Sequence, residues 1–149
     1  MADIKAKYGS ITTVTVTGLD SLAGGSYTTV ANCSEVDNTS NLFVDVLVEV
    51  YIASITAAGN KQVIVYAVNS LDDTNYSDGQ SGNPQIMRVL GVVPMNGSGP
   101  WRSAAMSLSA AFAGAIPPKW KVVLHNDNSS TALTTGNTVK YRGMHYQSV

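Results

Sequence analysis

One stretch of the sequence alternates so strictly that it points to a single regular structure. From Leu42 to Ile52 every second residue is aliphatic, and the residues between them include Asp45 and Glu49. Because the side chains of a β-strand point alternately to the two faces of a sheet, this period of two predicts a long strand with one buried face.

The same period recurs in seven further segments, separated by stretches rich in Gly, Pro, Asn, Asp and Ser. They are Ser10–Leu19, Tyr27–Cys33, Lys61–Asn69, Gln85–Val93, Trp101–Phe112, Lys119–His125 and Thr138–Gln147. Eight short strands in 149 residues predict an all-β fold, an antiparallel β-sandwich of about eight strands with a jelly-roll-like arrangement. An up-and-down barrel is the alternative. We expect one sandwich domain over residues 10–149, preceded by an N-terminal arm, residues 1–9.

For one of the eight segments, a helix is an alternative to the strand. Ser103–Ala115 is rich in alanine, which has the highest helix propensity. Its apolar residues also alternate, however, and Pro100 and Pro117 bracket it. We therefore favour a strand over Trp101–Phe112.

Composition narrows the class of protein. Charged residues make up 13% of the chain, about half the usual share, and the formal net charge is -1. Charge-driven binding to nucleic acid is therefore not expected. The 44% hydrophobic content argues against disorder. No apolar run approaches the roughly 20 residues of a membrane helix, and the N-terminus has no signal-peptide core, so we expect synthesis in the cytoplasm and no membrane partner.

The few charges are unevenly distributed. Residues 8–84 hold one Lys against eight Asp and Glu, whereas residues 85–149 hold six Lys and Arg against one Asp. Opposed acidic and basic surfaces would favour oriented contacts between copies. The alternative is that sandwich strands interleave the two halves and mix the charges.

Catalytic signatures are missing from the sequence. The two histidines, His125 and His145, accompany no Gly-x-Ser-x-Gly elbow and no phosphate-binding glycine loop. The single cysteine, Cys33, is predicted to be a small, buried apolar side chain. We therefore predict that the protein is not an enzyme, with no catalytic residues and no cofactor.

Two groups of residues are candidate metal ligands. The histidines fall near the ends of the last two predicted strands, but two imidazoles without a third ligand favour ordinary polar positions. The loop with Asp72, Asp73, Asn75 and Asp78 offers oxygen ligands for Ca²⁺, but its spacing is not that of an EF-hand, and Asp and Asn also cap turns. We predict no metal site.

The two tryptophans are predicted to lie in different environments, one in the core and one on the surface. Trp120 shares a strand face with Val122 and Leu124 and is predicted to lie in the core. Trp101, beside Arg102 at a strand start, is the best candidate for an exposed contact aromatic. With 7% aromatic residues the chain offers few platforms for carbohydrate.

Several stretches resemble small virion structural proteins of tailed bacteriophages, over roughly residues 60 to 149. They are Ser70–Asp78, Leu90–Pro94, Trp101–Ser103, Leu108–Asn126 and Val139–Gly143. The resemblance implies a jelly-roll or β-sandwich subunit that coats the capsid head as a decoration (cement) protein, typically a homotrimer. Its partners would be the major capsid protein of the same virion and further copies of itself, and its location the capsid surface.

On this interpretation residues 2–8 form an arm that docks on a neighbour or pairs with it by strand addition. The expected interface residues are Ile4, Lys5, Lys7, Tyr8, Trp101 and Arg102. Two other functions stay open: an adaptor associated with the tail, collar or fibre, and a carbohydrate-binding module for host recognition.

Overall fold

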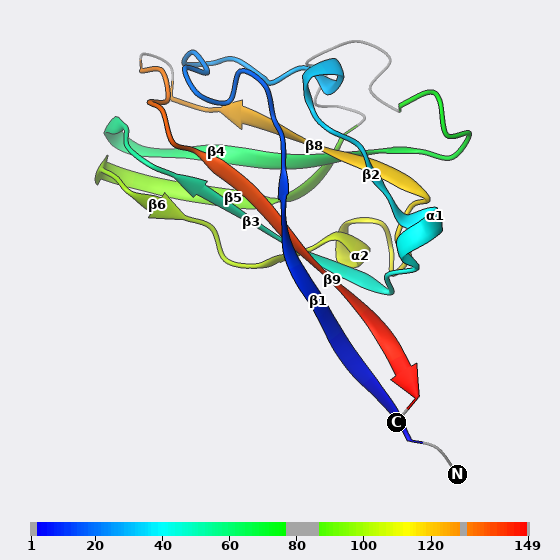
Figure 1. Cartoon of the computed structure of the whole chain (residues 1–149). Helices are drawn as coiled ribbons and strands as arrows, with labels where there is room; N and C mark the ends of the chain where they lie inside the picture. Colours follow the sequence, from blue (N-terminus) through cyan, green and yellow to red (C-terminus); the bar gives the residue numbers. More distant parts are fainter. Residues whose placement is uncertain (1–2, 77–86, 129–130, 149) are drawn as a thin grey trace.

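A computed structural model describes residues 3–76, 87–128 and 131–148. Its regular elements, shown in Figure 1, are mostly strands, and the all-β prediction is confirmed. The strands are β1 (Ile4–Val14), β2 (Val36–Asp37), β3 (Asp45–Ile52), β4 (Thr56–Ser70), β5 (Arg88–Ser98), β6 (Trp101–Arg102), β7 (Met106–Ser107), β8 (Lys119–Asn126) and β9 (Thr138–Ser148). The helices are one-turn segments: η1 (Val30–Asn32), α1 (Asn38–Asn41) and α2 (Leu108–Ala111).

The strands pair in a nested order that defines the topology. β1 pairs with β9, β2 with β8, β3 with β6 and β7, and β4 with β5, all antiparallel. One long antiparallel ribbon folded over itself produces this nesting. When the ribbon rolls up, β9 also lies beside β3, and β8 beside β4. The two resulting sheets have the orders β1-β9-β3-β6 and β2-β8-β4-β5, which is a jelly roll in which β6 and β7 share one strand position.

The core lies between the two sheets, and strand periodicity explains which side chains fill it. Along β3 the residues alternate half-buried and buried, and Val46, Val48, Val50 and Ile52 are fully buried. Trp120 of β8 is also fully buried and packs edge-on against the Tyr141 ring, with 5.6 Å between centroids. Its predicted place in the core is confirmed.

A smaller apolar cluster covers the other face of the β2-β8-β4-β5 sheet. It contains Val30, Tyr66, Val68, Val123 and the buried Cys33, as predicted for that cysteine. The segment over these residues was expected to be a strand from Tyr27 to Cys33. It instead forms the 3-10 helix η1, with isolated bridges from Tyr27 to His125 and from Val16 to Cys33. Thr28, Val30 and Cys33 of this segment are buried although it forms no strand ladder, and the alternation ends at the exposed Ala31 and Asn32.

The expected strand from Trp101 to Phe112 is wrong for most of its length. The structure has the two-residue strands β6 and β7, followed by the helix α2. Asp45 explains the change, because its carboxylate accepts hydrogen bonds from the Ser107 hydroxyl (2.8 Å) and the Ser109 N–H (3.0 Å). The Ser107 hydroxyl in turn caps the helix by accepting from the Ala110 N–H (3.2 Å). Asp45, 62 residues before Ser107 in the sequence, thus holds the start of the helix in place. The alanines that follow favour a helical turn once its first N–H groups are capped.

Other strand boundaries also differ from expectation. β1 spans Ile4–Val14 instead of Ser10–Leu19, β4 begins at Thr56 instead of Lys61, and β5 runs on to Ser98 instead of ending at Val93. The strand predicted from Leu42 begins at Asp45, because Leu42 adopts a left-handed conformation (φ 54°) that ends α1. β2 lies between the expected strands Tyr27–Cys33 and Leu42–Ile52, where no strand was expected. Its two residues form a strand because they pair with Trp120 and Lys119 of β8.

The fold interleaves the acidic and basic halves of the sequence. Each sheet contains strands from both halves. Among the described residues, the ion pairs Arg102–Glu49 and Lys119–Glu35 each join a cation of the second half to an acid of the first. The structure therefore favours the interpretation in which the charges largely mix.

Candidate functional site

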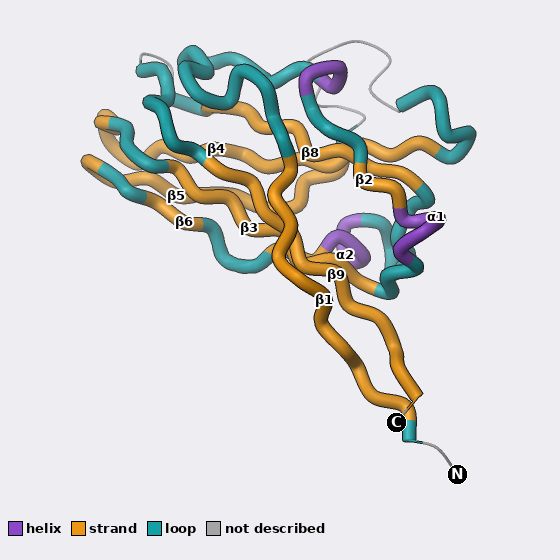
Figure 2. The backbone as a smooth tube through the Cα atoms, viewed as in Figure 1, coloured by secondary structure: helices purple, strands orange, loops and turns teal. Residues whose placement is uncertain are grey.

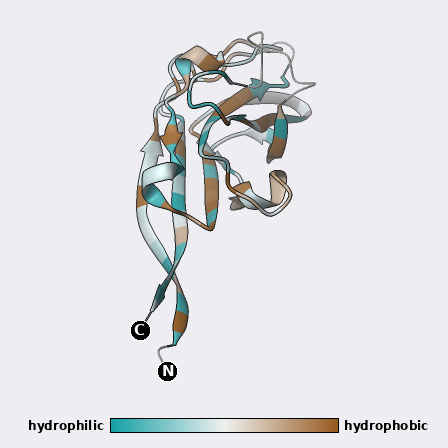
Figure 3. Ribbon diagram, turned by 90° about the vertical axis from the view of Figure 1, so that its right-hand side faces the viewer, coloured by the Kyte–Doolittle hydropathy of each residue, from teal (hydrophilic) through white to brown (hydrophobic). Residues whose placement is uncertain are grey.

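The first and last strands form a two-stranded ribbon that projects from the body of the sandwich (Figures 1 and 2). β9 has β3 as its second neighbour up to Met144, and the residues beyond that point pair with β1. The side view in Figure 3 shows the start of β1 and the end of β9 together at the tip of this ribbon. The division expected between residues 9 and 10 thus falls inside β1, which runs on to Val14.

One face of the ribbon is apolar and open to solvent. Ile4, Tyr8 and Tyr146 are 74%, 53% and 63% exposed, respectively. The register places them on the same face, because Ala6 lies opposite Tyr146 and Tyr8 opposite Met144. These residues, with Met144, are called the ribbon face below.

A β-bulge extends this apolar face onto the sandwich. Between Tyr8 and Ile11, β1 has one more residue than β9, because these two residues lie opposite Met144 and Arg142. The extra residue keeps Tyr8 and Ile11 on one face although they are three positions apart. Ile11, 59% exposed, then lies beside Arg142 on the outer face of the sheet, and Leu47 of β3 flanks Arg142 on its other side.

That outer face holds a shallow groove of about 300 Å³. The side chains that line it include Ile11, Leu47, Glu49, Arg102, Lys140 and Arg142, and we call it the cationic groove. Leu47 and Glu49 point outward because the alternate residues of β3 are buried. Arg102 forms an ion pair with Glu49, and its guanidinium lies 5.1 Å from the centre of the Tyr51 ring.

The structure separates the six residues expected at an interface. Ile4 and Tyr8 belong to the ribbon face, and Arg102 lies on the same outer surface at the opposite sheet edge. Lys5 and Lys7 alternate with Ile4 and therefore occupy the reverse face of the ribbon. Trp101, expected to be exposed, is half-buried against the core.

Sequence reasoning missed Ile11, Leu47, Lys140 and Arg142 as neighbours. Their period-2 positions could have indicated an outward face on each strand. The pairing of β9 between β1 and β3, which brings them together, has no local signal.

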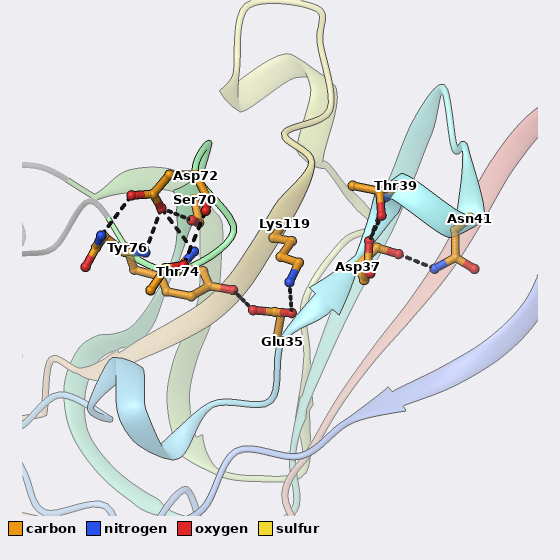
Figure 4. A network of polar contacts seen from close by, with 10 residues as sticks. Glu35, Asp37, Thr39, Asn41, Ser70, Asp72, Thr74, Tyr76 and Lys119 are labelled. Carbon is orange, nitrogen blue, oxygen red and sulfur yellow. Dashed lines mark hydrogen bonds and ion pairs between the residues drawn. The ribbon is translucent and has the colours of Figure 1, made fainter.

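A second polar region lies at the end of the other sheet, where β4, β8 and the segment before β2 meet (Figure 4). The Tyr76 hydroxyl donates to the Glu35 carboxylate, which also pairs with Lys119 at 3.1 Å. The hydrogen bond from Tyr76, together with Lys119, lowers the pKa of Glu35, and burial with the Glu35 contact raises the pKa of Tyr76. These contacts tie Glu35 to the 70–76 turn.

Asp72 organises that turn. Its carboxylate accepts hydrogen bonds from the backbone N–H groups of Asn75 (2.7 Å) and Thr74 (3.0 Å), from the Asn75 amide (2.8 Å) and from the Ser70 hydroxyl (3.0 Å). This is the capping role that Asp favours in turns. Of the other proposed calcium ligands, Asp73 and Asn75 are exposed, and Asp78 lies outside the described residues.

The two histidines lie in different sheets. His125 of β8 stacks on Tyr27 with 4.0 Å between ring centroids, and His145 of β9 packs against Phe43. Within residues 3–76, 87–128 and 131–148, no group of three metal-ligating side chains comes together. In the same ranges no helix has the length and hydropathy needed to cross a membrane.

The turn around Asp72 predicts a pH dependence of stability. Hydrogen bonds from Asn75, Thr74 and Ser70 hold the pKa of Asp72 well below its usual value of 3.8. A carboxyl group with a lowered folded-state pKa stabilises the fold above its unfolded-state pKa and loses that contribution as the pH falls through the folded-state value. We expect Asp72→Asn to lower the melting temperature at neutral pH. The difference from wild type should shrink below about pH 4, because wild-type Asp72 then begins to lose its advantage.

Thermal unfolding followed by circular dichroism from neutral to acid pH checks this expectation. Asp73→Asn is the matched control, because it removes the neighbouring charge without removing the cap. A constant difference between Asp72→Asn and wild type across the acid range would contradict the assigned role.

The comparisons with known proteins are sparse. No protein-family model matches the chain. No curated protein sequence matches it either. Among solved structures, a chain of the Desmodium yellow mottle tymovirus is similar over 99% of this chain and 88% of that chain, with 12% sequence identity and a TM-score of 0.32. At that TM-score the assignment of the fold rests on the strand order itself.

Proposed function

We propose that this chain is a non-enzymatic structural subunit of a bacteriophage virion, a decoration protein that binds the outer surface of the capsid head and stabilises the shell as a homo-oligomer. Its partners in this role are the major capsid protein of the same virion and further copies of itself. The proposal involves no nucleic acid, membrane, cofactor or catalytic residue.

The ribbon face is the observation that carries this proposal. A two-stranded ribbon in water is marginally stable by itself, and among the described strands β1 has a neighbour, β9, along only one of its two edges. Three large apolar side chains, Ile4, Tyr8 and Tyr146, nevertheless stay more than half exposed on it. A partner surface that covers them would explain why they are apolar.

The body of the molecule supports the same role. The nested strand order is that of the jelly roll, an architecture used by viral capsid subunits, lectins and cupins. Cupin-type chemistry lacks support in the described residues, where no metal-ligating cluster forms. The sequence resemblance to virion proteins of tailed phages favours the capsid alternative over the lectin one.

Substitutions on the ribbon face test the proposal. We expect Ile4→Asp combined with Tyr8→Asp to weaken binding to particles that lack the protein by roughly 100-fold or more. Burying each large apolar side chain contributes about 1.5–3 kcal/mol, and each 1.4 kcal/mol is tenfold in affinity. Co-sedimentation of purified chain with virions or empty heads measures the change, and electron microscopy locates the bound copies.

A matched control uses Leu42→Asp, because Leu42 is 71% exposed but lies between α1 and β3, outside the ribbon. Wild-type occupancy of the head by the ribbon variant would contradict the proposed docking. Density on the tail, collar or fibre would favour an adaptor. Binding on a glycan array without binding to heads would favour a carbohydrate-binding module.

A further inference from the structure

The cationic groove carries more positive charge than its own residues neutralise. Arg102, Lys140 and Arg142 face a single carboxylate, Glu49, which already pairs with Arg102. The groove also has apolar side chains, because Ile11 of β1 remains 59% exposed and Leu47 of β3 lines the groove on the other side of Arg142. A small anion would leave Ile11 in water. The groove therefore suits an occupant that brings an apolar side chain together with negative charge.

The same chain presents such a segment on its other sheet. Leu71, directly after β4, is 78% exposed, the largest exposed fraction among the large hydrophobic residues in the described part of the chain. Two carboxylates follow it. Asp72 holds the turn through its four hydrogen bonds, and Asp73 is exposed with a left-handed backbone (φ 62°).

The turn is preorganised for a contact of this kind. The four hydrogen bonds to Asp72 hold its backbone, so that docking orders little additional chain. The Tyr76–Glu35 contact ties its far end to the body (Figure 4). Leu71 and Asp73 thus form a small projection with one apolar and one acidic group.

We propose that the cationic groove of one copy receives the Leu71–Asp73 turn of a second copy. Leu71 packs on the exposed Ile11, while the Asp73 carboxylate offsets part of the charge of Lys140 and Arg142. The groove lies on the β1-β9-β3-β6 sheet and the turn extends from β4 of the other sheet, so the contact joins different molecules. This inference rests on the homo-oligomer in the proposed function and identifies one of its contacts.

The contact has a defined symmetry consequence. Groove and turn are different surfaces of one chain, so a contact between them is heterologous, and its repetition closes a ring or continues as a chain. The ribbon face is not used in this contact. It stays available for the shell.

Complementary variants test the contact. The turn variant Leu71→Ala/Asp73→Asn removes the apolar and charged groups, and Asn tolerates the left-handed backbone at position 73. The groove variant Arg142→Glu reverses a charge that lies opposite Ile11 and Leu47. We expect each to weaken self-association of the purified chain at least tenfold in sedimentation equilibrium. The wild-type association should also weaken as salt is added.

Mixing the two variants gives the sharpest result. The groove variant keeps an intact turn and the turn variant keeps an intact groove, so the mixture should form mixed pairs although each variant alone associates at least tenfold more weakly than wild type. Leu42→Ala and Arg88→Glu are matched controls, since Leu42 is similarly exposed and Arg88 is an exposed cation on β5. Both should associate like wild type.

Other outcomes overturn the contact. They are a wild-type chain that stays monomeric up to millimolar concentration, variants that associate like wild type, or a mixture that forms no mixed pairs. Binding to heads, measured separately with the ribbon variant, decides the proposed function. A failure of the groove contact is thereby distinguishable from a failure of the decoration role.

Discussion

Replacing Trp120 by alanine should destabilise the protein by about 3–5 kcal/mol, the usual cost of removing a fully buried aromatic side chain. Trp120 has no solvent exposure and contacts the Tyr141 ring across the two sheets. It also lies on β8, between β2 and β4. The cavity would therefore open in the middle of the sandwich, where the strand ladders limit collapse. At this chain length the loss corresponds to a fall in melting temperature of roughly 6–20 °C.

Chemical denaturation with two probes measures this effect, and Trp120→Phe is the matched variant. The indole N–H of Trp120 has no hydrogen-bond partner among the described residues, so phenylalanine loses volume but no hydrogen bond. We expect Trp120→Phe to cost less than half as much as alanine. Equal costs for the two variants would contradict a packing role, as would an alanine variant within about 1 kcal/mol of wild type.

Replacing Asn126 by alanine should cost about 3 kcal/mol although the side chain is small. Asn126 is fully buried at the end of β8. Its amide donates to the carbonyl oxygens of Leu22 (3.0 Å) and Thr131 (2.9 Å), and its Oδ1 accepts from the Asn128 N–H (3.2 Å). Alanine would leave these backbone groups without that partner, at roughly 1–3 kcal/mol for each one that stays buried.

Asn126→Asp separates hydrogen bonding from shape. A carboxylate has the shape of the amide but turns two donors into acceptors that face carbonyl oxygens. We expect it to destabilise at least as much as alanine at neutral pH. Those carbonyls would raise the folded-state pKa of the new carboxyl, and a raised pKa means that stability is lost as the pH rises. The deficit should therefore shrink on acidification toward about pH 4. Wild-type stability of Asn126→Asp in urea unfolding at neutral pH would contradict the network.

The elements that could be predicted from the sequence are the strands in which the alternation of apolar and polar residues identifies the buried side chains. In β3 the buried positions follow from alternation, and on β8 Trp120 falls on the same buried face as Val122 and Leu124, although Val123 on the opposite face is also buried. The local pattern is sufficient to identify these buried faces, because successive side chains of a strand point to opposite faces of the sheet.

The segment after Trp101 shows where local pattern fails. Alternation and alanine content favoured different structures there, and the outcome depends on hydrogen bonds from Ser107 and Ser109 to Asp45. Sequence reasoning could not detect this, because the partner lies on a distant strand. The candidate site has the same origin. Ile4, Tyr8 and Arg102 were predicted as contact residues, but their common outer surface depends on the sheet order.

The period of two and the composition were enough to predict the all-β class, the two-layer arrangement and the buried face of a regular strand such as β3. The tertiary structure alone decided which strands are neighbours. The pairing of β1 with β9 created the projecting ribbon, and the place of β9 beside β3 assembled the cationic groove. Strand pairing is a long-range choice, since many partners satisfy the same alternating pattern and only the packing of the whole sandwich distinguishes them.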